Sequence, residues 1–348
     1  MEVLVTEDWL LKLPKVDLHL HLDGSVKPET ILELALHQGI DLPVYDKDQL
    51  IPHMRVNDEC SSLTEYLSKF HFTTRFLQLA EALDRVAYEV AQQAAEHNCK
   101  YVEVRFAPQL HRDMGLTVEE TIQHVIEGLN RGRRDFGVRA GVIVICMRHH
   151  AIETNLEVVT AAAKFAGRGV VAVDLAGDEA SYPPEIFRDV FAESKRLGLP
   201  ITIHAGEAAG AANVYEAVAN LGAVRIGHGV RLRENASILE LVRNRRIPLE
   251  MCPISNIQTK AVPSWESYPI REYLERGLMV TINTDNPSVS GTNITKEYRV
   301  LADRFGFTAP ELVKLIMNGV EAAFLEESDK LTLRREMENE LSSLGLLN

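Results

Sequence analysis

The chain has few cysteines, and their positions exclude two common structural roles. Its 348 residues include four cysteines that are far apart and show no paired spacing: Cys60, Cys99, Cys146 and Cys252. A disulfide framework or a cysteine-based zinc cluster would need cysteines at short, regular spacings. We therefore expect four reduced, buried thiols.

Long apolar runs and positive charge are also scarce. No segment approaches the roughly 20 apolar residues of a membrane helix, and residues 1–8 are acidic where a secretory signal would be basic. Lys and Arg number 37 against 50 Asp and Glu, a formal net charge of −13. Duplex nucleic acid would require clustered cations. These shortages predict a cytoplasmic protein with no membrane or nucleic-acid partner, whose ligand is a small neutral or cationic molecule.

What the chain does contain is an alternation of β-like and helical segments. Hydrophobic residues make up 46% and charged residues 25%, as in globular proteins with an ample core. Eight nearly continuous apolar runs are predicted as strands covered on both faces. They occupy residues 16–22, 101–107, 142–147, 170–175, 201–204, 224–230, 248–252 and 278–283. The segments between them can hold crossover helices, so the sequence predicts an α/β fold, a single (β/α)8 TIM barrel over residues 1–348.

Capping signals mark several helix starts. Pro28 is placed to open a helix in the first long connection, because proline suits the first helical turn. Thr117 with Glu120, and Thr308 with Glu311, have the spacing of a capping box. These residues predict three helices between or after the strands.

The first crossover is unusually long, because residues 23–100 separate the first two predicted strands. We expect a helical insertion at about residues 40–75. One apolar face of a helix is predicted there, from Leu63, Tyr66, Leu67 and Phe70 at spacings of three and four. This face could pack on the barrel exterior, but loops that follow strands emerge at the catalytic mouth, which favours a lid. Residues 298–348 are helix-like and are expected to close the barrel exterior.

Four short segments at predicted strand ends carry candidate site residues. They are His19-Leu20-His21, His204-Ala205-Gly206-Glu207, Gly227-His228-Gly229 and Asn283-Thr284-Asp285-Asn286. Alternate side chains of a strand share a face, so His19 and His21 project together. Three imidazoles and one carboxylate suit a catalytic zinc that keeps a position for water. The candidate ligands are His19, His21, His204 and Asp285.

A single metal ion is predicted. Binuclear barrel hydrolases commonly bridge their metals with a carboxylated lysine from the fourth strand, but here that run ends Asp174-Leu175-Ala176-Gly177. With one ion, His228 is free to act on water and Glu207 is free to transfer protons. Alternatively, each could form only a structural hydrogen bond. The pattern favours a hydrolase with one activated water.

Other polar strand residues are interpreted as structural. Glu103 and Arg105 alternate on the second run and are interpreted as a buried ion pair of the barrel floor, and Asp174 as a group that orients a metal ligand. The remaining eight histidines fall on predicted helices or loops and receive no role. Polynucleotide deaminases use His-x-Glu with Pro-Cys-x-x-Cys, a pattern that Pro253 after Cys252 does not reproduce.

Six segments stand in order along almost the whole chain: KVDLHLHLDGS (15–25), DLAGDE (174–179), HAGE (204–207), GHG (227–229), CPISN (252–256) and NTD (283–285). Together they resemble the adenosine deaminases of the amidohydrolase superfamily. The resemblance implies zinc-dependent hydrolytic deamination of adenosine and 2′-deoxyadenosine to inosine and 2′-deoxyinosine, with release of ammonia, in purine salvage.

The resemblance also implies residue roles. One zinc would be bound by the four candidate ligands, while Glu207 would protonate purine N1 and His228 with Asp285 would orient the water that adds to C6. The implied substrate-binding residues are His21, Asp23 facing the ribose hydroxyl, Gly177 with its N–H at purine N3, Asn286, and the lid residues Leu63, Tyr66, Leu67 and Phe70. Many adenosine deaminases have Asp, at purine N7, where this chain has Asn286.

Two alternatives stay open. The chain could deaminate another aminopurine, such as adenine or a modified or 5′-substituted adenosine, or it could be a non-catalytic purine-binding relative. The intact ligand set with Glu207 and His228 favours an enzyme. Asp23 stands where similar adenine deaminases tend to carry Glu, and the shorter carboxylate leaves room for a sugar. The sequence leaves the oligomeric state open.

Overall fold

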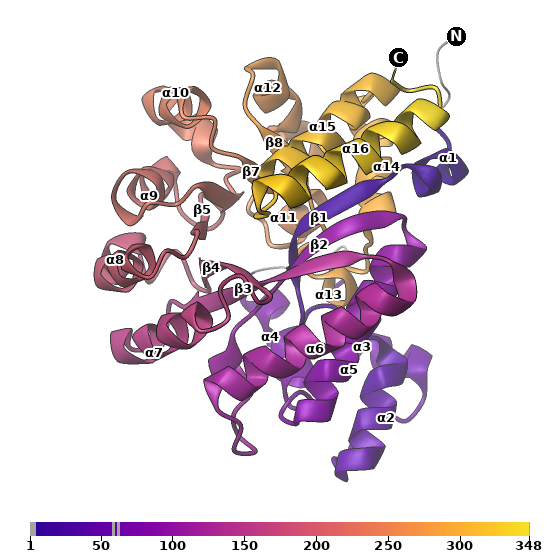
Figure 1. Cartoon of the computed structure of the whole chain (residues 1–348), viewed down its shortest axis with the longest axis vertical. Helices are drawn as coiled ribbons and strands as arrows, with labels where there is room; N and C mark the ends of the chain where they lie inside the picture. The colour runs from indigo at the N-terminus through magenta and orange to yellow at the C-terminus, as the bar shows by residue number, and fades with distance from the viewer. Residues whose placement is uncertain (1–4, 58–59, 61–62, 348) are drawn as a thin grey trace.

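The computed structural model describes residues 5–57, 60 and 63–347, except the side chains of residues 63 and 64. Within these residues, eight strands form the centre of the molecule (Figure 1). They are β1 (Lys15–His21), β2 (Cys99–Phe106), β3 (Arg139–Met147), β4 (Val170–Ala176), β5 (Thr202–Ala205), β6 (Arg225–His228), β7 (Leu249–Met251) and β8 (Val280–Ile282). Each overlaps one predicted run, so the predicted alternation is confirmed.

Two four-stranded parallel sheets meet at both edges to close the barrel. One runs β1-β2-β3-β4 and the other β5-β6-β7-β8. A parallel bridge between Val173 and Ile201 joins β4 to β5. At the other seam, the Asp285 N–H donates to the His19 carbonyl and the His21 N–H donates to the Asp285 carbonyl, each at 2.7 Å. Asp285 is therefore fixed by the same backbone bonds that close the barrel.

Helices surround this barrel (Figure 1). They are α1 (Glu7–Lys12), α2 (Pro28–Gln38), α3 (Lys47–Met54), α4 (Leu63–Thr74), α5 (Ala80–Glu96), α6 (Val118–Phe136), α7 (Ile152–Ala163), α8 (Arg188–Arg196), α9 (Ala211–Glu216), α10 (Ala236–Asn244), α11 (Pro253–Gln258), α12 (Ile270–Glu275), α13 (Pro287–Ser290), α14 (Ile294–Phe305), α15 (Ala309–Ala322) and α16 (Glu327–Ser343). The predicted starts are confirmed: α2 begins at Pro28, and both capping boxes form.

The long connection between β1 and β2 holds α2 to α5. Val56, which lies shortly after α3, contacts α13: its N–H donates to the Val289 carbonyl at 2.9 Å. Val56, Cys60, Tyr66 and Val289 form a small apolar cluster apart from the main core, with Phe70 packed against it. Because α13 directly follows the last strand, the insertion is attached at the mouth where the strands end.

The opposite end of the barrel is closed by the last residue of α15 and the residues that follow it. Arg225 donates to the Ala322 carbonyl at 2.9 Å, and its guanidinium lies 3.8 Å from the ring centre of Phe324. Glu103 accepts the N–H of Phe324 at 2.6 Å. The C-terminal helices therefore cover the barrel. This agrees with the prediction made for residues 298–348, as far as the structure describes them.

The interpretation of Glu103 and Arg105 as an ion pair is wrong. Glu103 pairs with Arg225 at 2.6 Å, whereas Arg105 pairs with Asp174 at 2.8 Å and with Glu250 at 2.7 Å. Residues two apart on a strand sit about 6.6 Å apart along its axis. They therefore lie at different levels of the barrel, and each reaches across to another strand.

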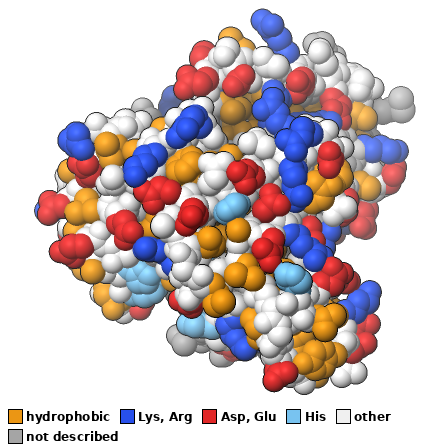
Figure 2. All heavy atoms as spheres, turned by 60° about the horizontal axis from the view of Figure 1, so that its bottom comes forward, with side chains coloured by type: hydrophobic (Ala, Val, Ile, Leu, Met, Phe, Trp, Pro, Cys, Tyr) orange, Lys and Arg blue, Asp and Glu red, His pale blue; other side chains and the backbone are white. Residues whose placement is uncertain are grey.

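The expectation about the cysteines is confirmed by the structure. All four cysteines are buried thiols. Among the described residues, no helix has both the length and the apolar character needed to cross a bilayer. On the face drawn in Figure 2, Lys and Arg side chains are interspersed with Asp and Glu side chains.

Candidate active site

The ends of β1, β5, β6 and β8 bring the predicted site residues to one mouth of the barrel. One side-chain atom each of His19, His204, His228 and Asp285 lies within 4.8 Å of the others, and all four residues are buried. His21 lies beside this group, with Nε2 3.2 Å from Asp285 Oδ1. The residues meet because parallel strand ends converge at one face. Their nitrogen and oxygen atoms could hold a metal ion.

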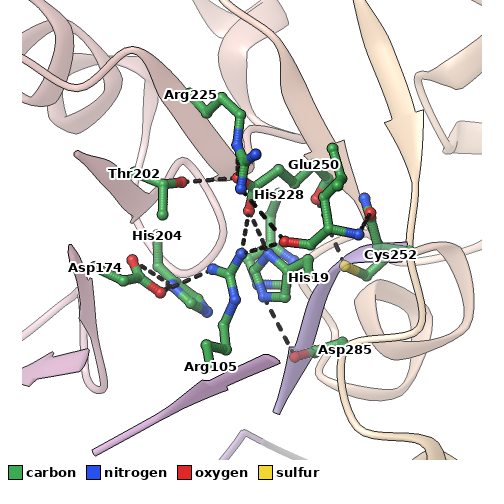
Figure 3. Close-up of polar contacts among 12 residues, drawn as sticks. His19, Arg105, Asp174, Thr202, His204, Arg225, His228, Glu250, Cys252 and Asp285 are labelled. Atoms are coloured by element: carbon green, nitrogen blue, oxygen red, sulfur yellow. Dashed lines mark hydrogen bonds and ion pairs between the residues drawn. The ribbon is translucent and has the colours of Figure 1, made fainter. Parts of the chain in front are cut away.

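Buried carboxylates orient two of the imidazoles (Figure 3). His19 Nδ1 lies 2.7 Å from Glu250 Oε2, and His204 Nδ1 lies 2.9 Å from Asp174 Oδ2. An ionised carboxylate only accepts, so each Nδ1 carries the hydrogen and each Nε2 turns a lone pair toward the site. His19 Nε2 is buried without a hydrogen-bond partner among the described residues. Asp174 thus orients its histidine, as its sequence position predicts.

The local electrostatics favour forms that bind a cation. Burial lowers the pKa of His19 to about 4 and holds the pKa of His21 well below its usual range, so both are neutral at pH 7. Burial alone would raise the pKa of Asp285, but the adjacent histidines hold it well below its ordinary value. Burial alone would lower the pKa of His204, but the Asp174 carboxylate raises it above its ordinary value. A metal ion that binds His204 therefore has to displace a proton.

His228 has the opposite orientation. Its Nδ1 lies 2.9 Å from Asn256 Nδ2, and Tyr268 Oη donates to Asn256 Oδ1 at 3.1 Å. From this second bond we infer that the amide NH2 faces His228, so that Nδ1 accepts and Nε2 carries the hydrogen of the neutral ring. That Nε2 lies 3.5 Å from Glu207 Oε2. His228 therefore presents a donor toward Glu207, which suits an oxygen of water or substrate better than a metal.

The backbone is strained at both His228 and Asp285. Their φ angles are +63° and +59°, in the left-handed region that side chains disfavour. Such conformations cost on the order of 1–3 kcal/mol each and persist where the surroundings impose them. At Asp285 the two bonds to β1 impose it. Strain at two members of one cluster is typical of a functional site.

Glu207 lies on a loop that a second carboxylate shapes. Glu179 accepts the backbone N–H groups of residues 206–209 at 2.7 to 3.1 Å. Burial raises the pKa of Glu207 above its ordinary value, although nearby His228 lowers it. The side chain keeps 14% exposure and lines a cavity of about 440 Å³. A buried acid that a ligand can reach and whose pKa is raised suits proton donation.

The other predicted substrate contacts lie near this centre. Asp23 and Asn286 are buried, and Oδ1 of each has no hydrogen-bond partner among the described residues. Asn286 precedes α13, but its side chain makes no capping hydrogen bond. Gly177 follows β4 with a φ of +106°, a conformation that requires glycine. Burial raises the pKa of Asp23 to about 6.

The predicted lid face is described in part. Tyr66 is buried, with only 2% exposure, and Leu67 is half-buried. The ring of Phe70 lies 6.5 Å from that of His21, centre to centre. The side chain of Leu63 lies outside the described part. An aromatic face of α4 therefore borders a site histidine, while its action as a lid stays a prediction.

Comparison with known proteins decides the family. The family model described as adenosine deaminase matches residues 14–340. The chain belongs to the adenosine deaminase family. Among its relatives, adenosine deaminase of Clostridium botulinum (strain Okra / Type B1) is 44% identical over 323 residues, which cover 93% of this chain and 96% of the relative.

Solved structures agree with this membership. Adenine deaminase from Arthrobacter aurescens superposes with a TM-score of 0.88 at 27% identity, covering 95% of this chain and 99% of that one. A zinc-bound amidohydrolase from Burkholderia ambifaria gives a TM-score of 0.90 at 25% identity, with coverages of 99% and 95%. The protein is a hydrolase of the adenosine deaminase family with a TIM-barrel fold.

The buried charges of this adenosine deaminase family member fit a divalent cation. The ion-paired and site groups comprise two arginines and four carboxylates: Arg105, Arg225, Glu103, Asp174, Glu250 and Asp285. Within this set the carboxylates outnumber the arginines by two; the buried cation Arg148 lies outside the set and donates to the His204 carbonyl at 2.7 Å. Uncompensated buried charge is costly, and a bound divalent ion would balance it.

Three contributors to the site were not predicted from the sequence. Glu179 and Asn256 lie inside the segments DLAGDE and CPISN, where no role was assigned to them. Glu250 lies inside an apolar run predicted to be buried on both faces. A carboxylate in that position must have partners, because a buried unpaired charge is strongly unfavourable. That argument could have identified Glu250, although it could not have named His19 as its partner.

Proposed function

We propose that the protein catalyses the hydrolytic deamination of adenosine and 2′-deoxyadenosine to inosine and 2′-deoxyinosine, with release of ammonia. One observation carries this proposal. The acid Glu207 and the N–H donor His228 lie 3.5 Å apart, and His228 belongs to a buried His/Asp group in which His19 Nε2 makes no hydrogen bond among the described residues. This arrangement supports a proton donor and a water-holding group that act on one reacting carbon.

We propose that one zinc ion per chain is held by His19, His21, His204 and Asp285. The neutral imidazoles, the outward Nδ1 hydrogens and the surplus of negative charge support this set, as does the bound zinc of the Burkholderia relative. When bound, zinc supplies Lewis acidity that lowers the pKa of a water toward about 7.

The chain's own residues then move the protons. Protonated Glu207 donates to purine N1, which makes C6 electrophilic. The Asp285 carboxylate accepts a hydrogen from the attacking water, and Nε2–H of His228 holds the oxygen that bonds to C6. The proton of the new C6 hydroxyl passes to the amino nitrogen, the C6–N bond breaks, and ammonia leaves C6 as a carbonyl. The proton that the water gave up restores protonated Glu207.

Substrate contacts follow from the groups around this centre. His21 and Asp23 lie on the β1 side for the sugar, the N–H of Gly177 would meet purine N3, and Asn286 would meet N7. The apolar face of α4, including Tyr66 and Phe70, would cover the bound purine. Buried polar atoms without partners, such as Oδ1 of Asp23, support ligand contacts at these places.

A substrate panel tests the proposed activity. Zinc-loaded protein is incubated with adenosine, 2′-deoxyadenosine, adenine and a 5′-substituted adenosine, and ultraviolet loss and ammonia release are followed. We expect the first two to be deaminated most efficiently. The adenine deaminase among the structural neighbours makes adenine the second candidate substrate. Ammonia release from none of the panel would contradict the enzyme proposal.

Asp23 should contribute to a preference for the nucleoside adenosine over the free base adenine. Adenosine should exceed adenine by a wide margin in kcat/KM, and Asp23→Ala should narrow that margin, because a hydrogen bond between a sugar hydroxyl and a charged group contributes about 1.5–3 kcal/mol. The matched control is Asp48→Ala on the exposed surface of α3, which should change neither value. Equal efficiency on the two compounds in the unmodified enzyme would reject the nucleoside preference.

Asn286 should donate a hydrogen bond to purine N7. N7 only accepts hydrogen bonds, and an amide always carries donor hydrogens. We therefore expect 7-deazaadenosine to have a kcat/KM at least about 10-fold below that of adenosine, because the buried amide would lose its partner. Asn286→Ala should process both nucleosides with similar efficiency. An Asn286→Ala enzyme that still discriminates between them would assign N7 recognition to another residue.

A further inference from the structure

A layer of buried, ion-paired side chains lies beneath the candidate metal ligands, and we call it the polar floor. It consists of Arg105, Arg225, Glu103, Asp174 and Glu250. Arg105 lies at its centre (Figure 3). Its side chain is 0% exposed. Nη1 donates to Asp174 Oδ2 at 2.8 Å, and Nη2 donates to Glu250 Oε2 at 2.7 Å and to the Leu18 carbonyl at 2.8 Å. One planar guanidinium therefore joins β2 to strands β1, β4 and β7.

The carboxylates that Arg105 contacts are the same two that orient the site imidazoles. Asp174 accepts from Arg105 at Oδ2 and from His204 at Oδ1, at 2.8 Å and 3.1 Å, and Glu250 Oε2 accepts from both Arg105 and His19. His19 and His204 come from strands that are not neighbours in the barrel. The guanidinium is the group through which their two supporting carboxylates are held at a fixed separation, because its fork is rigid and always charged.

We propose that Arg105 is a positioning residue that couples His19 and His204 into one metal-binding unit. Through Asp174 and Glu250 it fixes the direction of both imidazoles, so that both Nε2 atoms point at the same place. This inference rests on the metal site of the proposed function. It goes beyond that function because it assigns the geometry of the site to a residue that touches neither metal nor substrate.

Arg225 provides a matched control for this role. It is equally buried and also contacts Glu250, but through the other oxygen, Oε1, at 2.6 Å, and its second carboxylate is Glu103. Thr202 Oγ1 also donates to Glu250 Oε1, at 2.8 Å. Loss of Arg225 therefore removes a buried cation from the polar floor. Asp174 and Glu250 Oε2 keep their contacts with Arg105 and with the two imidazoles.

The test measures metal dissociation without substrate. Zinc-loaded Arg105→Lys and Arg225→Lys enzymes are mixed with excess chelator, and zinc release is followed by an indicator dye. Lysine keeps the charge but cannot contact both carboxylates in one plane. We expect release to be at least about 10-fold faster in Arg105→Lys, the usual scale for groups that support metal ligands, and within about threefold of the unmodified rate in Arg225→Lys. Unchanged release from Arg105→Lys would overturn the proposal, as would equal acceleration in both variants.

A second measurement decides the matter if Arg105→Lys does not fold. In metal-free protein with nitrogen-labelled histidine, Glu250→Gln should accelerate hydrogen exchange at Nδ1 of His204, which Glu250 does not contact, because Arg105 transmits the loss to Asp174. An unchanged His204 signal would overturn the coupling. Neither measurement uses a purine, so a failure of the proposed substrate does not affect them. A failure of the metal site would be visible separately, as an absence of zinc from the unmodified enzyme.

Discussion

An Asp285→Ala enzyme is expected to lose its metal and its activity together. The carboxylate is buried, ionised and 3.2 Å from His21 Nε2, so it supplies the anionic ligand of the proposed zinc site. In the proposed mechanism it also accepts a hydrogen from the attacking water. Loss of both contributions, worth several kcal/mol, should lower kcat/KM by at least about 1,000-fold. Metal analysis of purified protein should give about one zinc per unmodified chain and close to none per variant chain.

Ser255→Ala is the matched control for this experiment. Ser255 donates to Asp285 Oδ2 at 2.6 Å, so its removal weakens the support of the carboxylate and keeps the ligand. We expect zinc to remain at one per chain at saturating metal, with an affinity about 10-fold lower. His19→Ala should behave like Asp285→Ala. Full activity with two metals per chain would reject the single-ion site, and zinc retained by Asp285→Ala would remove Asp285 from the ligand set.

The barrel could be predicted from the sequence because its signals are local. A parallel strand covered on both faces reads as a continuous apolar run, as residues 142–147 do, and helix starts such as Pro28 are set by neighbouring residues. The site residues could be predicted for a related reason. Polar groups directly after such runs have to lie at the mouth of a closed parallel barrel, so His19, His204 and Asp285 were expected to meet.

The polar floor could not be predicted in the same way. Which carboxylate faces Arg105 depends on the stagger of strands around the barrel, and no local pattern encodes that stagger. The pairing of Arg105 with Asp174 and Glu250, rather than with Glu103, is set by this long-range register. The orientation of His228 depends likewise on Asn256 and Tyr268, which are distant in sequence.

A Glu207→Gln enzyme is expected to keep its fold and its zinc while kcat falls by at least about 100-fold, the usual scale of general acid catalysis. Glutamine has nearly the same shape and can still accept a hydrogen bond, but it cannot deliver a proton to purine N1 as an acid does. Circular dichroism and metal analysis should match those of the unmodified enzyme. Glu234→Gln, which lines the same cavity but pairs with Arg231 near solvent, is the control and should leave kcat within about twofold.

The pH dependence distinguishes a proton donor from a group that only binds. Burial raises the pKa of Glu207, so its protonated form persists to a higher pH than for an ordinary glutamate. If the protonated form is the active one, as proposed, activity should be present below that pKa and should be lost as the pH rises through it. Glu207→Gln has no such group, so the alkaline decline of kcat/KM that belongs to Glu207 should disappear from its profile. Near-normal turnover in the variant, or an unchanged alkaline decline, would show that another group protonates N1.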